Sequence, residues 1–338
     1  MKRGVEMRKY RFEAGLGVYP SFKTLIPVEH LEELGHYDLH NYHIYAILAF
    51  EEYYFKYEKV KCDTQGVSFS IFAITEDGEK IFDMPPMLLF NGLDHSKLKM
   101  SSKYPYKTIE FAIEDDEFLS ANNISREEQI VVSAQDIFQM NAYSLVDKVE
   151  YEVLYIGQAY GQEGERTALM RLKSHSTLQK ILAEASLNYP NKHIFIMLFE
   201  IAENLNMMFD GMSDKVKKTD EESQAHMEEV LSDLPKEKQV INITEAAMIN
   251  YFKPIYNEKL VNNFPNRNLK SYRQYFDLDY NSLTVELDLE LDYYPTLQFY
   301  TENARINSIW EAIRYELFNE RDRASMYDIF RKKGDNLA

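Results

Sequence analysis

The chain has 338 residues, more than twice the length of a typical single domain, so we expect two or three folded units. With 45% hydrophobic residues and only 12 Gly and 10 Pro, it is neither collagenous nor wholly disordered. Its single cysteine, Cys62, excludes an intramolecular disulfide and a multi-thiolate zinc site, so we expect a cytoplasmic protein. Apolar runs such as Ile194–Phe199 are too short to cross a bilayer, and we expect no membrane association.

The charge is strongly acidic but unevenly distributed. The 38 basic and 55 acidic residues give a net charge of -17, which on average argues against a polyanionic partner. The range Tyr251–Arg273 reverses the balance, because its only acid is Glu258. Its five basic residues are Lys253, Lys259, Arg267, Lys270 and Arg273. Charge therefore has to be assessed locally, beside each motif.

Residues 1–130 are expected to form an aromatic-rich domain with β structure. Val67–Thr75 alternates as a strand does, Asp77-Gly78 is a hairpin turn signal, and Lys80–Met84 is the expected return strand. Thr108–Ile113 predicts a further strand.

One stretch of this region, Tyr42–Lys61, is ambiguous. Its aromatic and β-branched residues favour a strand and its Ala and Glu residues favour a helix, and periodicity does not decide between them.

Residues 131–262 show a clearer succession of elements. The stretch 203–238 is rich in charged residues and predicts an insertion, partly helical or mobile. After it, Thr244 is a good N-cap for a helix that ends before Pro254. The expected elements are strands at Ala142–Asp147, Glu152–Ile156 and His193–Ile201, and helices at Arg166–Ala185 and Thr244–Tyr251.

Residues 263–338 are expected to form a C-terminal α/β extension. Leu283–Asp292 alternates strictly between apolar and acidic residues and predicts a strand buried on one face. A closing helix is predicted from the helical spacing of Ile306, Ile309, Trp310, Ile313 and Leu317. This apolar stripe indicates core packing, with a subunit interface as the alternative.

The middle region resembles the GIY-YIG endonuclease family. Tyr155-Ile156-Gly157, preceded by Asn141-Ala142-Tyr143, is similar to the two short motifs that define it, although Asn141 stands where Gly is usual and Ala142 where Ile or Val is. The family's other parts follow in order: Arg171 and His175 on a helix, an apolar strand, a helix with Glu245, and a final Asn257. The resemblance covers about residues 139–259, roughly a third of the chain.

The resemblance implies a phosphodiester hydrolase, and the residues suit that chemistry. Tyr143 is the candidate that the resemblance implies for the base, a role that needs a cation to favour its phenolate, and Tyr155 is a further catalytic candidate. The planar guanidinium of Arg171 suits a phosphate. Glu245 would hold Mg²⁺ or Mn²⁺. The remaining candidates are His175 beside the phosphate, Gly157 for close backbone approach, and Asn257 for a supporting hydrogen bond. Taken singly, Tyr143 and Tyr155 are typical of packing residues, and Arg171 and Glu245 are typical of charges on a solvated helix face.

The predicted fold class is therefore α+β and multidomain. A central GIY-YIG-type domain, with a small three-stranded sheet flanked by helices, would lie between the N-terminal β-rich domain and the C-terminal extension. The expected function is metal-dependent cleavage of DNA, with Gly157, Lys253, Lys259, Arg267, Lys270 and Arg273 as substrate-binding residues.

Two alternatives stay open on sequence grounds. The first is a catalytically silent nucleic-acid-binding or assembly protein that retains the fold, which the net charge of -17 favours. The second is a nuclease activated by a partner protein. A homo-oligomer formed through the C-terminal helix is a further possible partnership.

Overall fold

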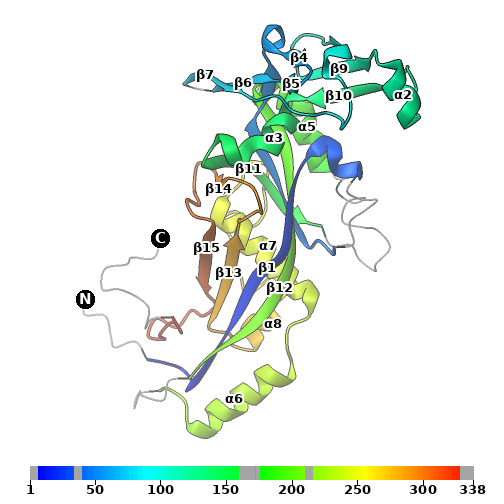
Figure 1. The fold of residues 1–338 in the computed structure, drawn as a ribbon. Helices are drawn as coiled ribbons and strands as arrows, with labels where there is room; N and C mark the ends of the chain where they lie inside the picture. The colour runs from blue at the N-terminus through cyan, green and yellow to red at the C-terminus, as the bar shows by residue number, and fades with distance from the viewer. Residues whose placement is uncertain are drawn as a thin grey trace.

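The computed structural model describes residues 7–33, 40–75, 77–159, 172, 176–209 and 216–327. The protein has a mixed α/β fold organised on one seven-stranded sheet, in the order β14-β11-β2-β12-β1-β13-β15 (Figure 1). Its strands are β1 (Phe12–Pro27), β2 (Ile44–Glu51), β11 (Lys148–Gln158), β12 (Lys192–Phe209), β13 (Ser282–Asp288), β14 (Thr296–Tyr300) and β15 (Trp310–Glu316). Each of the three ranges predicted as domains contributes strands to this sheet.

Helices cover both faces of the central strands. The apolar residues of α7 (Glu237–Phe252) belong to the same core as Ile44, Ala46 and Leu48 of β2. Those of α5 (Ser176–Asn188) pack on the opposite face, with Ile47 and Ala49. Because both faces are covered, β2 is buried and free of charged residues from Ile44 to Phe50, and only its last residue, Glu51, is charged and partly exposed. The ambiguous range Tyr42–Lys61 thus begins with the most buried strand of the sheet.

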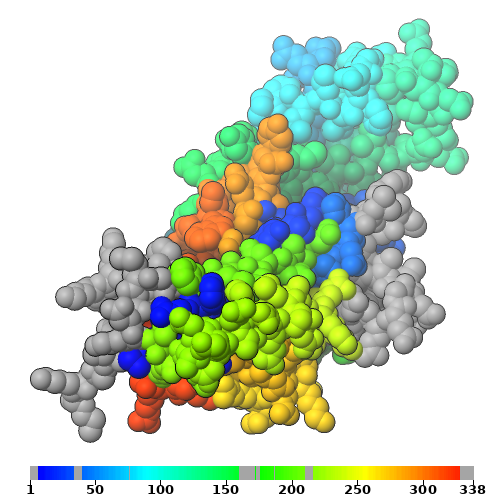
Figure 2. All heavy atoms as spheres, turned by 90° about the horizontal axis from the view of Figure 1, so that it is seen from below, coloured from blue at the N-terminus to red at the C-terminus, as the bar shows by residue number. Residues whose placement is uncertain are grey.

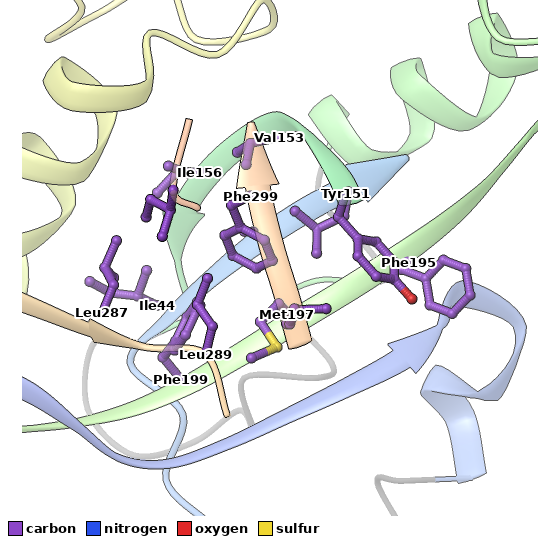
Figure 3. Packing of buried hydrophobic residues seen from close by; sticks show 14 of the residues in the cluster. Ile44, Tyr151, Val153, Ile156, Phe195, Met197, Phe199, Leu287, Leu289 and Phe299 are labelled. Atoms are coloured by element: carbon purple, nitrogen blue, oxygen red, sulfur yellow. The ribbon is translucent and has the colours of Figure 1, made fainter. Parts of the chain in front are cut away.

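The main core lies between α7 and the sheet. Figure 3 shows side chains from several strands in one cluster, where Ile44 and Ile156 point into the same apolar region as Phe199 and Leu287. The predicted strand His193–Ile201 is confirmed, since it lies within β12. The predicted strand Leu283–Asp292 is confirmed only as far as Asp288, where β13 ends.

A separate lobe of small sheets is inserted between β2 and β11 (Figure 1). The predicted hairpin around Asp77-Gly78 is confirmed, because β6 pairs with β7 and Thr75 lies opposite Gly78. The predicted strand Thr108–Ile113 is confirmed as β9. The lobe contains β3 (Tyr53–Phe55), β4 (Lys61–Asp63), β5 (Gly66–Ser68), β6 (Ser70–Thr75), β7 (Gly78–Asp83), β8 (Leu98–Ser101), β9, β10 (Gln129–Ser133), α2 (Asp116–Asn122) and α3 (Ala134–Leu145).

The opposite end of the molecule carries α6 (Asp220–Ser232). Figure 2 views the molecule from this end, with the lobe beyond the sheet. The stretch 203–238, predicted as a partly helical insertion, contains α6 and also the C-terminal end of β12. This end of β12 pairs with β1 as far as Phe12 and Phe209. The capping box of Thr219 and Glu222 starts α6.

Two predicted elements in the middle and last thirds are wrong. Ala142–Asp147 is not a strand, because Ala142 is buried on α3, whose N-cap Ser133 accepts a hydrogen bond from the Asp136 N–H. The closing helix is replaced by β15, which pairs with β13 and places Ile313 opposite Val285. Cross-strand pairing outweighs the helical spacing here, and it removes the basis for an oligomer formed through a C-terminal helix.

The predicted N-cap at Thr244 is also wrong. Helix α7 begins at Glu237, and Thr244 is buried in its interior, where its hydroxyl donates to the Val240 carbonyl at 2.8 Å. A threonine hydroxyl bonded to the carbonyl four residues earlier is compatible with a continuing helix.

A buried ion cluster joins β1 to the turn before β13 and to the last described residues. The Arg323 guanidinium donates to Glu13 and to Asp279, both at 2.6 Å. The Asn281 amide also donates to Glu13, at 3.1 Å. Since a buried charge is costly unless it is paired, this cluster fixes the three segments together.

A second charged cluster lies where the lobe joins the sheet. His193, at the start of β12, contacts Glu52 (3.2 Å) after β2 and Glu29 (3.0 Å) in η1 (Val28–His30). Burial alone would lower the pKa of His193, but the hydrogen bonds with Glu29 and Glu52 outweigh it and raise this pKa to about 9. Lys107 of the lobe also binds Glu52, at 2.7 Å.

We expect this cluster to make stability depend on pH. Because the folded-state pKa of His193 exceeds its unfolded value, its stabilisation is complete below pH ~6.5 and is lost as pH rises through about 9. Because Glu29 remains in Glu52→Gln, the free energy of unfolding of the wild type should fall by about 1 to 2 kcal/mol more than that of Glu52→Gln between pH 6 and 9.5. Urea denaturation at both pH values measures this, and parallel pH profiles would contradict it.

Candidate active site

The centre of the site is the pairing of β2 with β11. Tyr45 lies opposite Gly157, and the rings of Tyr45 and Tyr155 have centroids 5.8 Å apart. A Cβ atom on Gly157 would lie 2.9 Å from the Tyr45 hydroxyl oxygen and 2.7 Å from Cε1 of Tyr155. Glycine is therefore required at position 157, because both tyrosine rings pack directly on its backbone.

Tyr45 is held in place on the face of the sheet that α5 covers. Its side chain is 1% exposed and belongs to a cluster with Leu178 and Ile181 of α5 and Leu154 of β11. Tyr155 is half-buried at the margin of this cluster. The two rings thus differ in access to solvent, and Tyr155 is the more open.

Glu245 meets the next residue of β11. The Gln158 side-chain amide donates to the Glu245 carboxylate at 2.6 Å and to the side-chain Oδ1 of Asn242 at 2.7 Å. Asn242 in turn donates to the Ser271 carbonyl at 3.1 Å. The Glu245 carboxylate, half-buried on α7, and Tyr45 therefore contact consecutive residues at the same end of β11.

Asn257 fixes the backbone between these two contacts. Its side chain accepts from the Ile156 N–H at 3.0 Å and donates to the Ile156 carbonyl at 2.9 Å. The preceding residue, Tyr256, donates its backbone N–H to Leu154 at 3.1 Å. The segment after α7 thus forms hydrogen bonds along the backbone of β11. Asn257 makes a supporting hydrogen bond of the kind expected for it, here to the backbone of Ile156.

The structure does not bring Tyr143 to this site. Tyr143 lies near the end of α3 with its side chain 68% exposed, in a hollow that Thr296 also lines. Thr296 pairs with Lys148, the first residue of β11. Gly157 lies nine residues further along that strand, a separation of roughly 30 Å.

Tyr45 is the residue that sequence reasoning missed. His43-Ile44-Tyr45 has the Ile-Tyr pair that the first family motif contains and that Asn141-Ala142-Tyr143 lacks. This pair is not recognised from the sequence as a partner of Tyr155-Ile156-Gly157, because more than a hundred residues separate Tyr45 from Tyr155. The other two predicted catalytic residues, Arg171 and His175, lie outside the described residues.

The predicted substrate-binding residues follow α7 along one edge of the site. The contact of Asn242 with Ser271 places η5 (Lys270–Tyr272) beside Glu245. Lys259 and Lys270 are exposed, whereas Arg273 pairs with Asp277 at 3.3 Å. The Arg267 guanidinium lies over the Phe276 ring at 5.6 Å, and Lys253 is half-buried at the end of α7.

The donor set fits a hard cation bound through one carboxylate. Within the described part of the chain, no group of three or more His, Cys, Asp or Glu side chains converges on a metal position. Glu245 is oriented by Gln158, and a single oriented carboxylate together with water and substrate oxygens suits Mg²⁺. The Glu245 carboxylate is therefore compatible with Mg²⁺ or Mn²⁺.

Comparisons with known proteins give no relative. No family model matches the chain, and searches of curated proteins and of solved structures found no match. Among the described helices, none is both long and apolar enough to span a membrane.

We expect Gly157→Ala to destabilise the protein through Tyr45. The added methyl group meets two rings, one of them buried, and overpacking of this kind costs about 1 to 3 kcal/mol. In a Tyr45→Ala background the same substitution should cost less, because one of the rings is gone. Chemical denaturation of the four proteins of this cycle measures the coupling, and additive losses would show that the rings do not enforce the glycine.

Proposed function

We propose that the chain is a metal-dependent DNA endonuclease with a GIY-YIG-type site, acting in the cytoplasm. The observation that carries the proposal is the placement of Tyr45, Tyr155, Gly157, Glu245 and Asn257 around one end of β11, with the two tyrosines on the α5 side of the sheet and Glu245 on the α7 side. Tyrosine, carboxylate and asparagine lie there in the order that the family resemblance implies. Tyr155 takes the role of base that the sequence assigned to Tyr143, and Tyr45 packs beside it.

The tyrosines supply the proton-transfer group in this proposal. A phenol ionises near pH ~10 in water, so it accepts a proton from an attacking water only when positive charge nearby favours the phenolate. Tyr45 is fixed by packing and Tyr155 faces the more open side, so Tyr155 is accessible to a substrate while Tyr45 defines the position of both rings. Arg171 remains, from sequence alone, the expected source of positive charge.

The carboxylate of Glu245 would hold the metal ion, which when bound supplies Lewis-acid stabilisation of phosphate oxygens. Gln158 orients that carboxylate, and Asn257 holds the intervening backbone at Ile156. The exposed Lys259 follows Asn257 by two residues, and the exposed Lys270 belongs to η5, which the contact of Asn242 with Ser271 places beside Glu245. Both lysines would contact the DNA phosphates there.

The two tyrosine assignments make different predictions. Tyr155→Phe should lower the turnover of DNA cleavage by about 100-fold or more, as loss of a proton-transfer group does. Tyr143→Phe removes an exposed hydroxyl at the far end of β11 and should leave turnover unchanged. The measurement is cleavage of single-stranded, duplex and branched DNA with Mg²⁺ or Mn²⁺. The reverse result would return the role to Tyr143.

Glu245→Gln should abolish metal-dependent cleavage while the fold is retained. The amide keeps the size of the side chain but removes the anionic ligand, and a half-buried helix residue of the same shape should alter the thermal midpoint little. Cleavage with and without EDTA measures the effect, and Glu228→Gln on the exposed surface of α6 is the matched control. Cleavage at the wild-type rate would contradict the metal assignment, and DNA binding with no cleavage by any variant would favour a silent binding protein.

A further inference from the structure

The lobe between β2 and β11 carries a surface that the proposed active site does not use. We define the lysine–tyrosine surface by Tyr104 and the exposed Lys59, Lys61, Lys99 and Lys103. Its parts come from η2 (Tyr57–Lys59), β4, the edge strand β8 and the turn that follows β8. The Tyr57 hydroxyl donates to the Met100 carbonyl at 3.2 Å, which brings Lys59 and Lys99 to the same region of the lobe.

Tyr104 stands at the end of a short series of stacked rings. Tyr106 stacks on Tyr57 with centroids 5.6 Å apart, and Tyr104 meets Tyr106 edge to face at 5.9 Å. The turn is closed by the Tyr106 N–H, which donates to the Lys103 carbonyl at 2.8 Å. Tyr104 is nevertheless 86% exposed, so its ring presents a supported but open face to solvent.

The four lysines of this surface differ from their neighbours in having no acidic partner. Lys56, Lys97 and Lys107 pair with acids of the lobe or the sheet at 2.7 to 3.0 Å. Among the described residues, no ion pair involves Lys59, Lys61, Lys99 or Lys103. From His95 to Ile109 the chain contains four lysines and no acid, in a protein of net charge -17. Two of these four lysines, Lys97 and Lys107, are paired, so the positive charge left without an ion pair in the described structure is that of Lys99 and Lys103, together with Lys59 and Lys61.

We propose that the lysine–tyrosine surface binds a single-stranded segment of nucleic acid, with lysines on phosphates and Tyr104 stacked on a base. Unpaired lysines interleaved with an exposed aromatic ring are the combination that binds single strands without sequence preference. A protein ligand of acidic character would use the lysines but would leave the Tyr104 ring without a role. The inference rests on the proposed nuclease function and specifies its substrate as DNA with a single-stranded flank.

The position of the lobe sets the length of that flank. The lobe follows Glu51, six residues along β2 from Tyr45, which corresponds to roughly 20 Å of extended chain. Figure 1 shows the small sheets beyond this point, away from α7. A substrate in contact with both places must therefore bridge at least roughly 20 Å from the cleaved bond.

The test compares two variants with the same change of charge. The surface variant is Lys59→Gln, Lys61→Gln, Lys99→Gln and Lys103→Gln, and the control is Lys80→Gln, Lys148→Gln, Lys236→Gln and Lys238→Gln on exposed sites elsewhere. Binding of a fluorescent 20-nucleotide single strand to the full chain is measured in EDTA, as a function of salt. Thermal midpoints confirm that each variant is folded.

We expect the surface variant to bind at least about tenfold more weakly than the control, with a slope of log affinity against log salt that is smaller by about 2 to 3. Tyr104→Ala should weaken binding by about 5- to 100-fold and leave the slope unchanged, because stacking releases no counterions. Equal affinity and slope for the surface variant and the control would overturn the inference, as would tighter binding of a blunt duplex than of the single strand.

The outcomes separate this inference from the proposed function. A chain that binds the single strand through the surface but cleaves no DNA with Mg²⁺ retains the inference and contradicts the nuclease. A chain that cleaves DNA in a Tyr155-dependent manner while the surface variant binds normally retains the nuclease and overturns the inference.

Discussion

The arrangement of the whole site depends on β2 being buried between β11 and β12. Its backbone is paired on both sides and its side chains are covered on both faces, so a shift of one residue would move every side chain to the opposite face. The register that results places Tyr45 against Gly157 and leaves Gln158 to meet Glu245. Asn257 then holds the backbone of Ile156 in that position. The geometry of the site is in this sense a consequence of strand register.

The lobe shows how a long insertion is accommodated without disturbing this register. It leaves the sheet after β2 and returns before β11, at the end of the two strands remote from Tyr45 and Gly157. The entropic cost of closing a loop grows only slowly with its length, and a loop that folds has its own core to offset that cost. The ion cluster of His193, Glu52 and Lys107 fixes the junction.

Local charge gives a consistent account of how an acidic protein would contact a polyanion. The lysines of the sheet and of much of the lobe are neutralised by nearby acids, as Lys23 is by Asp288 and Lys56 by Glu79. The lysine–tyrosine surface and the exposed Lys259 and Lys270 are exceptions to this pattern. A negatively charged remainder of the surface would restrict a nucleic acid to these regions, since like charge repels it elsewhere.

The sequence by itself determined the elements whose signals are local. These are the hairpin at Asp77-Gly78, the alternating strand from Leu283, and the strand that contains Tyr155-Ile156-Gly157. It failed where pairing partners decide the outcome, as at Ile313, where helical spacing yields to pairing with Val285. Only the tertiary structure identified Tyr45, because the residue that faces Gly157 is chosen by pairing across more than a hundred intervening residues. Strand register is a property of two segments at once, and no periodicity within either segment encodes it.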